Sequence, residues 1–213
     1  MLATRTFTEV WEVDQRLVSF GVTRQELIKV VAGVVAARAD AVDNDPVTAE
    51  GLFAYIFGTR FLRSLFRSKG YLTYRKDNIE GVEHAERDLK IIYQNVDVAA
   101  SIQQTPRALS AKGSASDRVI ESGQGDLFTE EELASAHVVK FGKIETGVWY
   151  FCVSVSGDDV RAELSLPMRI EGGNFADFIE RIFIVRGGEW AGLIVQSEPD
   201  QGPAEFEPVV TRK

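Results

Sequence analysis

Apolar residues recur three and four positions apart through most of the first 70 residues, which is the period of helices that bury one face. This pattern predicts helices over Phe7–Val18 and Arg24–Ala37, and Thr23 or one of its neighbours can cap the second of them. A third helix is predicted from Thr48 to about Ser68, because Asp45-Pro46 marks its start. We expect it to be the central helix of the N-terminal half, because it is rich in large apolar residues: Leu52, Phe53, Ile56, Phe57, Phe61, Leu62, Leu65 and Phe66.

The segment that follows has the alternation typical of strands. Leu72–Tyr74 and Leu89–Val96 are predicted strands, since both carry the β-branched and aromatic residues that strands favour. Gly81–Arg87 is open to two interpretations: its alternation suits a strand, whereas the apolar positions in and around it also approach helical spacing. We favour a strand pair in this part of the chain.

The C-terminal half shows the clearest two-residue period. Trp149–Val155 is apolar at every second position, and Val160–Leu166 repeats this pattern after a turn at Ser156–Asp159. The two runs predict a half-buried hairpin in which Glu163 and Ser165 alternate with the apolar side chains. Three further elements are predicted: an amphipathic helix over Asn174–Ile184 and strands over Trp190–Gln196 and Phe206–Thr211.

Ala99–Gly125 separates the two halves. This segment is rich in Ser, Gln, Gly and Ala, holds Lys112 and Arg118, and has few large apolar residues, so a flexible basic loop is expected. The whole pattern predicts an α+β fold, in which an N-terminal helical unit with a short strand pair precedes an antiparallel sheet with a packed helix. The expected division is 1–98, 99–125 and 126–213, the last being an acidic, β-rich unit.

The composition is that of a globular chain, with 213 residues, 45% hydrophobic and 26% charged. It excludes disordered, collagen-like and disulfide-scaffold classes. The single cysteine, Cys152, excludes an internal disulfide and a cysteine zinc cluster, and no cofactor or resident metal is expected. No apolar run approaches the roughly 20 residues of a membrane span, and no signal peptide is visible, so a cytoplasmic location without a membrane partner is expected.

The net charge of −8 taken alone argues against a nucleic-acid partner. The charge is unevenly placed, however. Residues 1–120 hold 16 basic and 15 acidic side chains, whereas residues 121–213 hold 8 and 17. Arguments about partners therefore apply to each half separately.

A basic and aromatic stretch is the first candidate for chemistry. Arg60–Lys76 contains six basic residues and no acidic one, and on a helix Arg60, Arg63 and Arg67 fall within about 60° of one another. Such a ridge can lie along the phosphate backbone of DNA or RNA, with tyrosines of the adjacent strands stacking on bases. The alternative is a solvated helix face whose arginines complement the helix dipole. The predicted nucleic-acid contacts are Arg60, Arg63, Arg67, Lys69, Lys112 and Arg118.

The second candidate is Gln124-Gly-Asp-Leu-Phe128. Gln124, Asp126, Leu127 and Phe128 resemble the short motif by which many bacterial proteins dock on the DNA polymerase sliding clamp, although Gly125 departs from its usual aliphatic second residue. The resemblance implies a bacterial or phage protein with the clamp as a partner. The alternative is local, because Phe128 also suits the hydrophobic staple of a short helix that Thr129 would cap.

The third candidate is acidic. Asp77 together with Asp88-Leu-Lys90 resembles the pattern of restriction-type nucleases, in which acids hold Mg²⁺ and a lysine polarises water or phosphate. The alternative is the wet side of an amphipathic strand.

These candidates favour a non-enzymatic binding or regulatory protein that acts near nucleic acid. A protein-interaction module or inhibitor that uses its acidic C-terminal half is the first alternative, and an Mg²⁺-dependent nuclease is the second.

Overall fold

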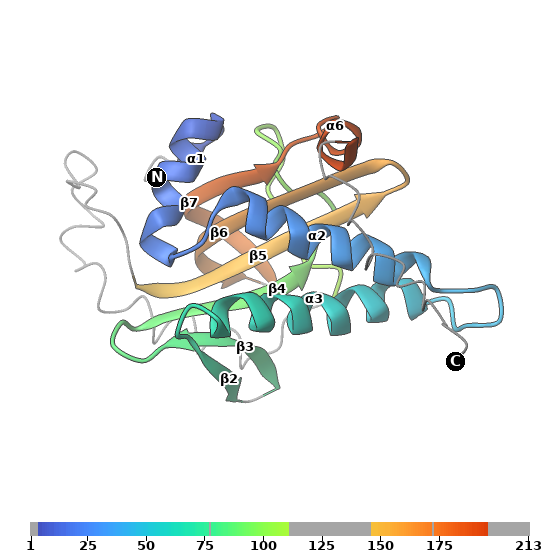
Figure 1. The fold of residues 1–213 in the computed structure, drawn as a ribbon, viewed down its shortest axis with the longest axis horizontal. Coiled ribbons are helices and arrows are strands. Elements are labelled where there is room, and N and C mark those ends of the chain that lie inside the picture. The colour runs from blue at the N-terminus through green and yellow to red at the C-terminus, as the bar shows by residue number, and fades with distance from the viewer. Residues whose placement is uncertain (1–3, 77, 111–145, 172, 196–213) are drawn as a thin grey trace, which may run out of the picture.

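The computed structural model describes residues 4–76, 78–110, 146–171 and 173–195. In these ranges a layer of helices covers one face of a sheet (Figure 1). The elements in chain order are β1 (Arg5–Phe7), α1 (Val10–Leu17), the 3-10 helix η1 (Val18–Phe20), α2 (Arg24–Ala39), α3 (Ala49–Arg67), β2 (Leu72–Lys76), β3 (Ile79–His84), β4 (Leu89–Asn95), β5 (Gly147–Ser156), β6 (Asp159–Glu171), β7 (Asn174–Val185) and α6 (Trp190–Val195).

The strands form one sheet in the order β1-β7-β6-β5-β4-β3-β2. The β1–β7 and β4–β5 pairs are parallel, and the other pairs are antiparallel. This mixed sheet with packed helices confirms the α+β class. Strands from the predicted segments 1–98 and 126–213 lie in the same sheet. The division at 99–125 stays a prediction, since only residues 99–110 of that loop are described.

The helices begin and end close to where the sequence predicts. Thr23 caps α2 through a complete capping box, because its side chain accepts from the Glu26 backbone N–H while the Glu26 carboxylate accepts from the Thr23 backbone N–H. The first predicted helix starts later than expected, at Val10, since Phe7 belongs to strand β1. No helix in the described ranges is long and apolar enough to cross a membrane.

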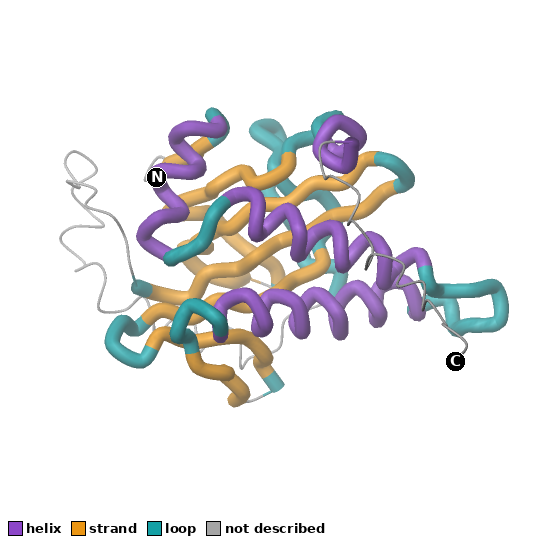
Figure 2. The backbone as a smooth tube through the Cα atoms, in the orientation of Figure 1, coloured by secondary structure: helices purple, strands orange, loops and turns teal. Residues whose placement is uncertain are grey.

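Two glycines allow the helix layer to lie close to its neighbours. α2 and α3 run side by side over the sheet (Figure 2). A Cβ on Gly33 of α2 would come within 2.5 Å of the Phe61 ring of α3, and a Cβ on Gly58 would collide with the Tyr93 ring of β4. Glycine at these two positions therefore sets the distance of α3 from both α2 and the sheet.

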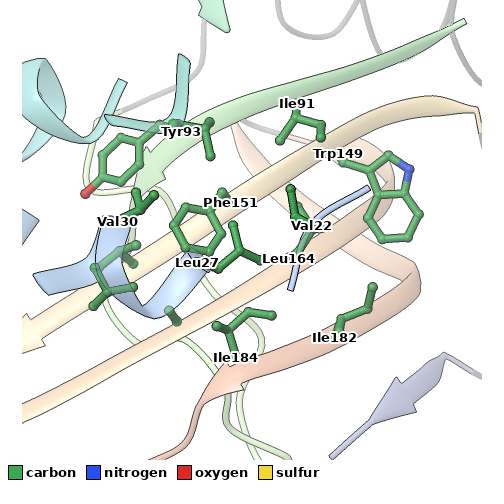
Figure 3. Packing of buried hydrophobic residues seen from close by; sticks show 14 of the residues in the cluster. Val22, Leu27, Val30, Ile91, Tyr93, Trp149, Phe151, Leu164, Ile182 and Ile184 are labelled. Carbon is green, nitrogen blue, oxygen red and sulfur yellow. The ribbon is translucent and has the colours of Figure 1, made fainter. Parts of the chain in front are cut away.

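The main core lies between the helix layer and the sheet. Figure 3 shows apolar side chains of the helix layer meeting those of the sheet. The residues labelled there are Val22, Leu27, Val30, Ile91, Tyr93, Trp149, Phe151, Leu164, Ile182 and Ile184, all of them buried.

The hairpin of β5 and β6 is confirmed, but the prediction that it is half-buried is wrong. Val148, Tyr150 and Cys152 point away from the helices, and all three are buried in a second apolar cluster on the far face of the sheet. Both faces of β5 are therefore covered, as in strands at the centre of a sheet with two packed faces.

A buried polar network lies on that far face. Glu163 and Ser165 are fully buried, because the Arg181 guanidinium donates to both carboxylate oxygens of Glu163 at 3.0 and 2.6 Å and the Ser165 hydroxyl donates at 2.6 Å. The backbone N–H of Ala100 also donates to Glu163, and Arg181 donates to the Ser101 carbonyl. These bonds fix the first residues after β4 on the sheet, so charge is tolerated there only because every partner is present.

The predicted helix over Asn174–Ile184 is wrong, since this segment is strand β7. Glu171 and Asn174 pair across a tight hairpin, with Gly173 at φ +77° between them. A register shift places Glu180 opposite Leu166 and Phe178 opposite Pro167, which leaves Ile179 without an opposing residue. In the sequence, the adjacent apolar residues Phe178 and Ile179 at this bulge therefore produce a spacing that resembles that of a helix.

The predicted strand over Trp190–Gln196 is also wrong, since the described part of it is the short helix α6. The Glu189 carbonyl accepts from the backbone N–H groups of Gly192 and Leu193, which starts a helical turn directly after the glycine turn at Gly188. A run of six apolar residues is too short for its period to separate helix from strand. The elements predicted at Thr129 and at Phe206–Thr211 lie outside the described residues.

Candidate functional site

Three of the predicted arginines line one open pocket on the outer face of α3. Its volume is about 650 Å³, and its lining residues are Tyr55, Ile56, Thr59, Arg60, Arg63, Ser64, Arg67 and Glu80. We call it the α3 pocket. All of these residues lie on α3 except Glu80, which lies on the neighbouring strand β3.

The period of α3 explains why these arginines meet. At 100° per residue, Arg60, Arg63 and Arg67 share one side of the helix. Leu62 and Phe66 lie on the other side and are fully buried against the sheet. The apolar side of α3 therefore fixes the direction in which its basic side faces.

Arg63 differs from the other two because it holds the sheet edge to the helix. Its Nε donates to the Gly81 carbonyl at 3.0 Å and its Nη2 donates to the Tyr74 carbonyl at 2.9 Å. Nη2 also lies 2.6 Å from the Glu80 carboxylate. Arg63 thus braces the β2–β3 hairpin against α3, and most of its donors are already used.

Arg60 and Arg67 are exposed, and their guanidinium groups form no ion pair with a described residue. The Arg60 guanidinium lies over the Phe57 ring, 4.5 Å from its centroid. This stacking orients the planar group while leaving its N–H donors free of protein carboxylates. The two side chains are therefore available to an anion from outside the chain.

Glu80 is the acidic residue among the pocket's lining residues, and it is neutralised from two sides. It pairs with Arg63 at 2.6 Å and with Arg75 at 3.0 Å. With three arginines against one carboxylate, the pocket is positive although the whole chain is negative.

The apolar half of the pocket was not expected. Ile56 and Tyr55, which line it, are 40% and 37% exposed, and Leu52 on the preceding turn is 52% exposed. Burial raises the pKa of the Tyr55 phenol, and the nearby Glu80 carboxylate adds to this shift, so the ring stays neutral. A helix with apolar residues on nearly every side signals a second apolar surface, and that was the sign available in the sequence.

Thr59 lies between the apolar and basic halves. It is only 6% exposed, and its hydroxyl oxygen is buried with no hydrogen-bond partner among the described residues. A buried hydroxyl without a partner costs about 1–3 kcal/mol. The α3 pocket therefore has an unsatisfied polar group next to its open space.

The remaining predicted nucleic-acid contacts do not join this pocket. Lys69 forms an ion pair with Glu26 of α2 at 2.7 Å. Tyr71 and Tyr74, which were expected to stack on bases, are buried at 4% and 7% exposure, so the prediction that these rings contact a ligand is wrong. Lys112 and Arg118 lie outside the described residues, as do Gln124, Asp126, Leu127 and Phe128 of the docking motif.

In the described residues, no further metal-ligating side chain joins the Mg²⁺ site predicted around Asp77, Asp88 and Lys90. The Lys90 ammonium lies 2.5 Å from the Asp88 carboxylate at the start of β4, and Asp77 lies outside the described residues. Within the described ranges no three His, Cys, Asp or Glu side chains are grouped as metal ligands are. Asp88 and Lys90 form an ion pair at the end of the sheet.

The comparisons with known proteins add no relative. No family model matches the sequence, and neither the curated proteins nor the solved structures contain a significant match.

Proposed function

We propose that this chain binds nucleic acid through the α3 pocket and works as a non-enzymatic binding or regulatory protein. The observation that carries this proposal is the pair of exposed arginines, Arg60 and Arg67, which lie on one helix face beside an open pocket and have no carboxylate partner in the described structure.

The spacing of these arginines suits a chain of phosphates. Arg60 and Arg67 are seven residues apart on one helix, which separates their backbones by about 10 Å. Phosphates of one strand follow one another at about 3.4 Å along a duplex and further apart in an extended strand. Two guanidinium groups at this spacing therefore reach phosphates a few nucleotides apart.

A titration of labelled oligonucleotides in increasing salt tests this proposal. Arg60→Gln/Arg67→Gln should weaken binding about ten-fold or more at low salt, and should reduce the salt slope by about 1.4 for a single strand, since each lost phosphate contact removes about 0.7. The matched control is Arg5→Gln/Lys29→Gln, which removes two exposed basic residues away from the pocket. Like Arg60, Arg5 lies over a phenylalanine ring, 4.5 Å from its centroid. Unchanged affinity in the first variant, or an equal loss in both, would overturn the proposal.

The sliding clamp is proposed as a protein partner on the sequence of Gln124–Phe128 alone. A clamp from a bacterial source should bind the full chain, and Leu127→Ala/Phe128→Ala should abolish that binding, because the apolar pair fills the pocket in motifs of this kind. Retained binding in this variant would remove the clamp from the proposal and leave the role of α3 intact.

A further inference from the structure

We infer that the α3 pocket selects single-stranded nucleic acid and receives an unstacked base beside Tyr55. This inference rests on the proposed function and names its ligand class. Arg60 and Arg67 contact phosphates, and Tyr55 and Ile56 contact the base.

The surroundings of α3 argue against a duplex. A helix that reads duplex DNA enters the major groove, which is about 8.5 Å deep. α3 does not protrude in this way, because α2 packs along one side of it and the β2–β3 hairpin is held to it by Arg63. Figure 2 shows the two long helices lying flat together over the sheet. A single strand of nucleic acid can lie along such a flat face, whereas the major groove of a duplex cannot enclose α3.

The apolar half of the pocket has no counterpart on the outside of a duplex. Tyr55 and Ile56 line this half and are partly exposed on the turn that precedes the arginines. A duplex offers phosphates and sugars at its surface, and its bases are stacked inside. A single strand offers base faces that can rest on an aromatic ring. The presence of aromatic and basic side chains in the lining of one pocket therefore matches the single strand.

The size and polarity of the pocket fit one nucleotide. Its volume of about 650 Å³ lies within the usual range for small-ligand sites, roughly 300–1,000 Å³. Thr59 lines the pocket, and its unpartnered hydroxyl would gain a partner from a polar base edge. The Arg60 guanidinium, already stacked on Phe57, offers its plane and its donors at the rim.

Fluorescence anisotropy of the full chain with labelled oligonucleotides of about 12 nucleotides tests the inference. The probes are single-stranded DNA, single-stranded RNA and the duplex of the same sequence. The affinity for single strands should exceed the affinity for the duplex by a factor of about ten or more. Tyr55→Ala should weaken single-strand binding about 5- to 150-fold and leave duplex binding unchanged, whereas Tyr55→Phe should stay within about two-fold of the wild type.

The control is Trp11→Ala, which removes an aromatic side chain, 67% exposed, from α1. It should change neither affinity. If Tyr55→Ala alters the circular dichroism of the protein, Tyr55→Leu replaces it, because leucine keeps apolar volume without a stacking ring.

The outcomes separate the two proposals. Equal affinity for single strand and duplex, with sensitivity to Arg60→Gln/Arg67→Gln but not to Tyr55→Ala, overturns the inference and leaves the proposed function standing. Absence of binding to every probe at low salt overturns both.

Discussion

The Arg16 guanidinium lies 2.5 Å from the Glu180 carboxylate, and both side chains are almost completely buried. The pair joins α1 to β7, and Arg16 also lies over the rings of Phe20 and Trp149. The second Glu180 oxygen has no hydrogen-bond partner among the described residues. A buried charge pair of this kind is sensitive to the loss of either partner.

Removal of one partner should therefore destabilise the protein strongly. Arg16→Met should lower the free energy of unfolding by about 3–5 kcal/mol, because it leaves the Glu180 carboxylate buried without a counter-charge. The double variant Arg16→Met/Glu180→Leu should recover most of that loss. Urea unfolding of the wild type and the variants measures both effects, and a double variant as unstable as the single one would contradict this account.

The same carboxylate should make stability depend on pH. Burial raises the pKa of Glu180 above its ordinary value, and the Arg16 charge opposes this shift without cancelling it. The folded state thus holds the proton more tightly than the unfolded state. Protonation of Glu180 therefore adds to the free energy of unfolding. This gain is fully present below about pH 4.3, the pKa of glutamate in an unfolded chain, and is lost as the pH rises through the folded-state pKa of Glu180. Glu180→Gln should remove this loss, which unfolding curves measured across the acidic range would show.

Gly58 should not tolerate a side chain. A Cβ at this position would collide with the ring of Tyr93, which is fully buried and cannot move aside. Gly58→Ala should lower stability by about 1–3 kcal/mol. Gly51 of the same helix has open space at its Cβ position, so Gly51→Ala should instead stabilise the protein by about 0.5–1 kcal/mol. Thermal unfolding of the two variants gives a matched comparison.

Arg63 and Arg67 should differ although both line the α3 pocket. Arg63→Ala removes the side-chain donors to the carbonyls of Tyr74 and Gly81, so it should lower stability by about 1–3 kcal/mol and speed amide exchange in β2 and β3. Arg67→Ala should change neither quantity by a measurable amount. Hydrogen exchange read by mass spectrometry distinguishes them, and unchanged protection of β2 and β3 in Arg63→Ala would show that the brace is not needed.

Much of the helix layer could be predicted because its signals are local. The capping box of Thr23 and Glu26 and the long apolar period of α3 depend only on nearby residues. The hairpin of β5 and β6 could also be predicted, because its alternating pattern and its turn involve only neighbouring residues. The order of strands in the sheet was not, since β1 pairs with β7 at the opposite end of the chain.

The errors came from places where tertiary contacts override local pattern. The bulge at Ile179 placed apolar residues side by side in β7, which imitated a helix. Glu163 has the position of a solvent-facing residue in the sequence pattern, and its burial depends on Arg181 of β7 together with Ser165 and the Ala100 backbone N–H. At the α3 pocket, the spacing of the arginines predicted that they share one side of the helix. The exposure of Tyr55 could not be predicted in this way, because it depends on how α2 and β3 pack beside α3.

The parallel pairing of β1 with β7 has a consequence for how the protein is made. Arg5 pairs with Glu180 and Phe7 pairs with Ile182, so two neighbouring strands of the sheet are separated by most of the described part of the chain. During translation β1 must wait, without its neighbour, until β7 has left the ribosome. Contacts between such distant segments slow folding, because the loop between them must close first. The pairing of β1 therefore requires β7 to be present, as does the Arg16–Glu180 ion pair that joins α1 to β7.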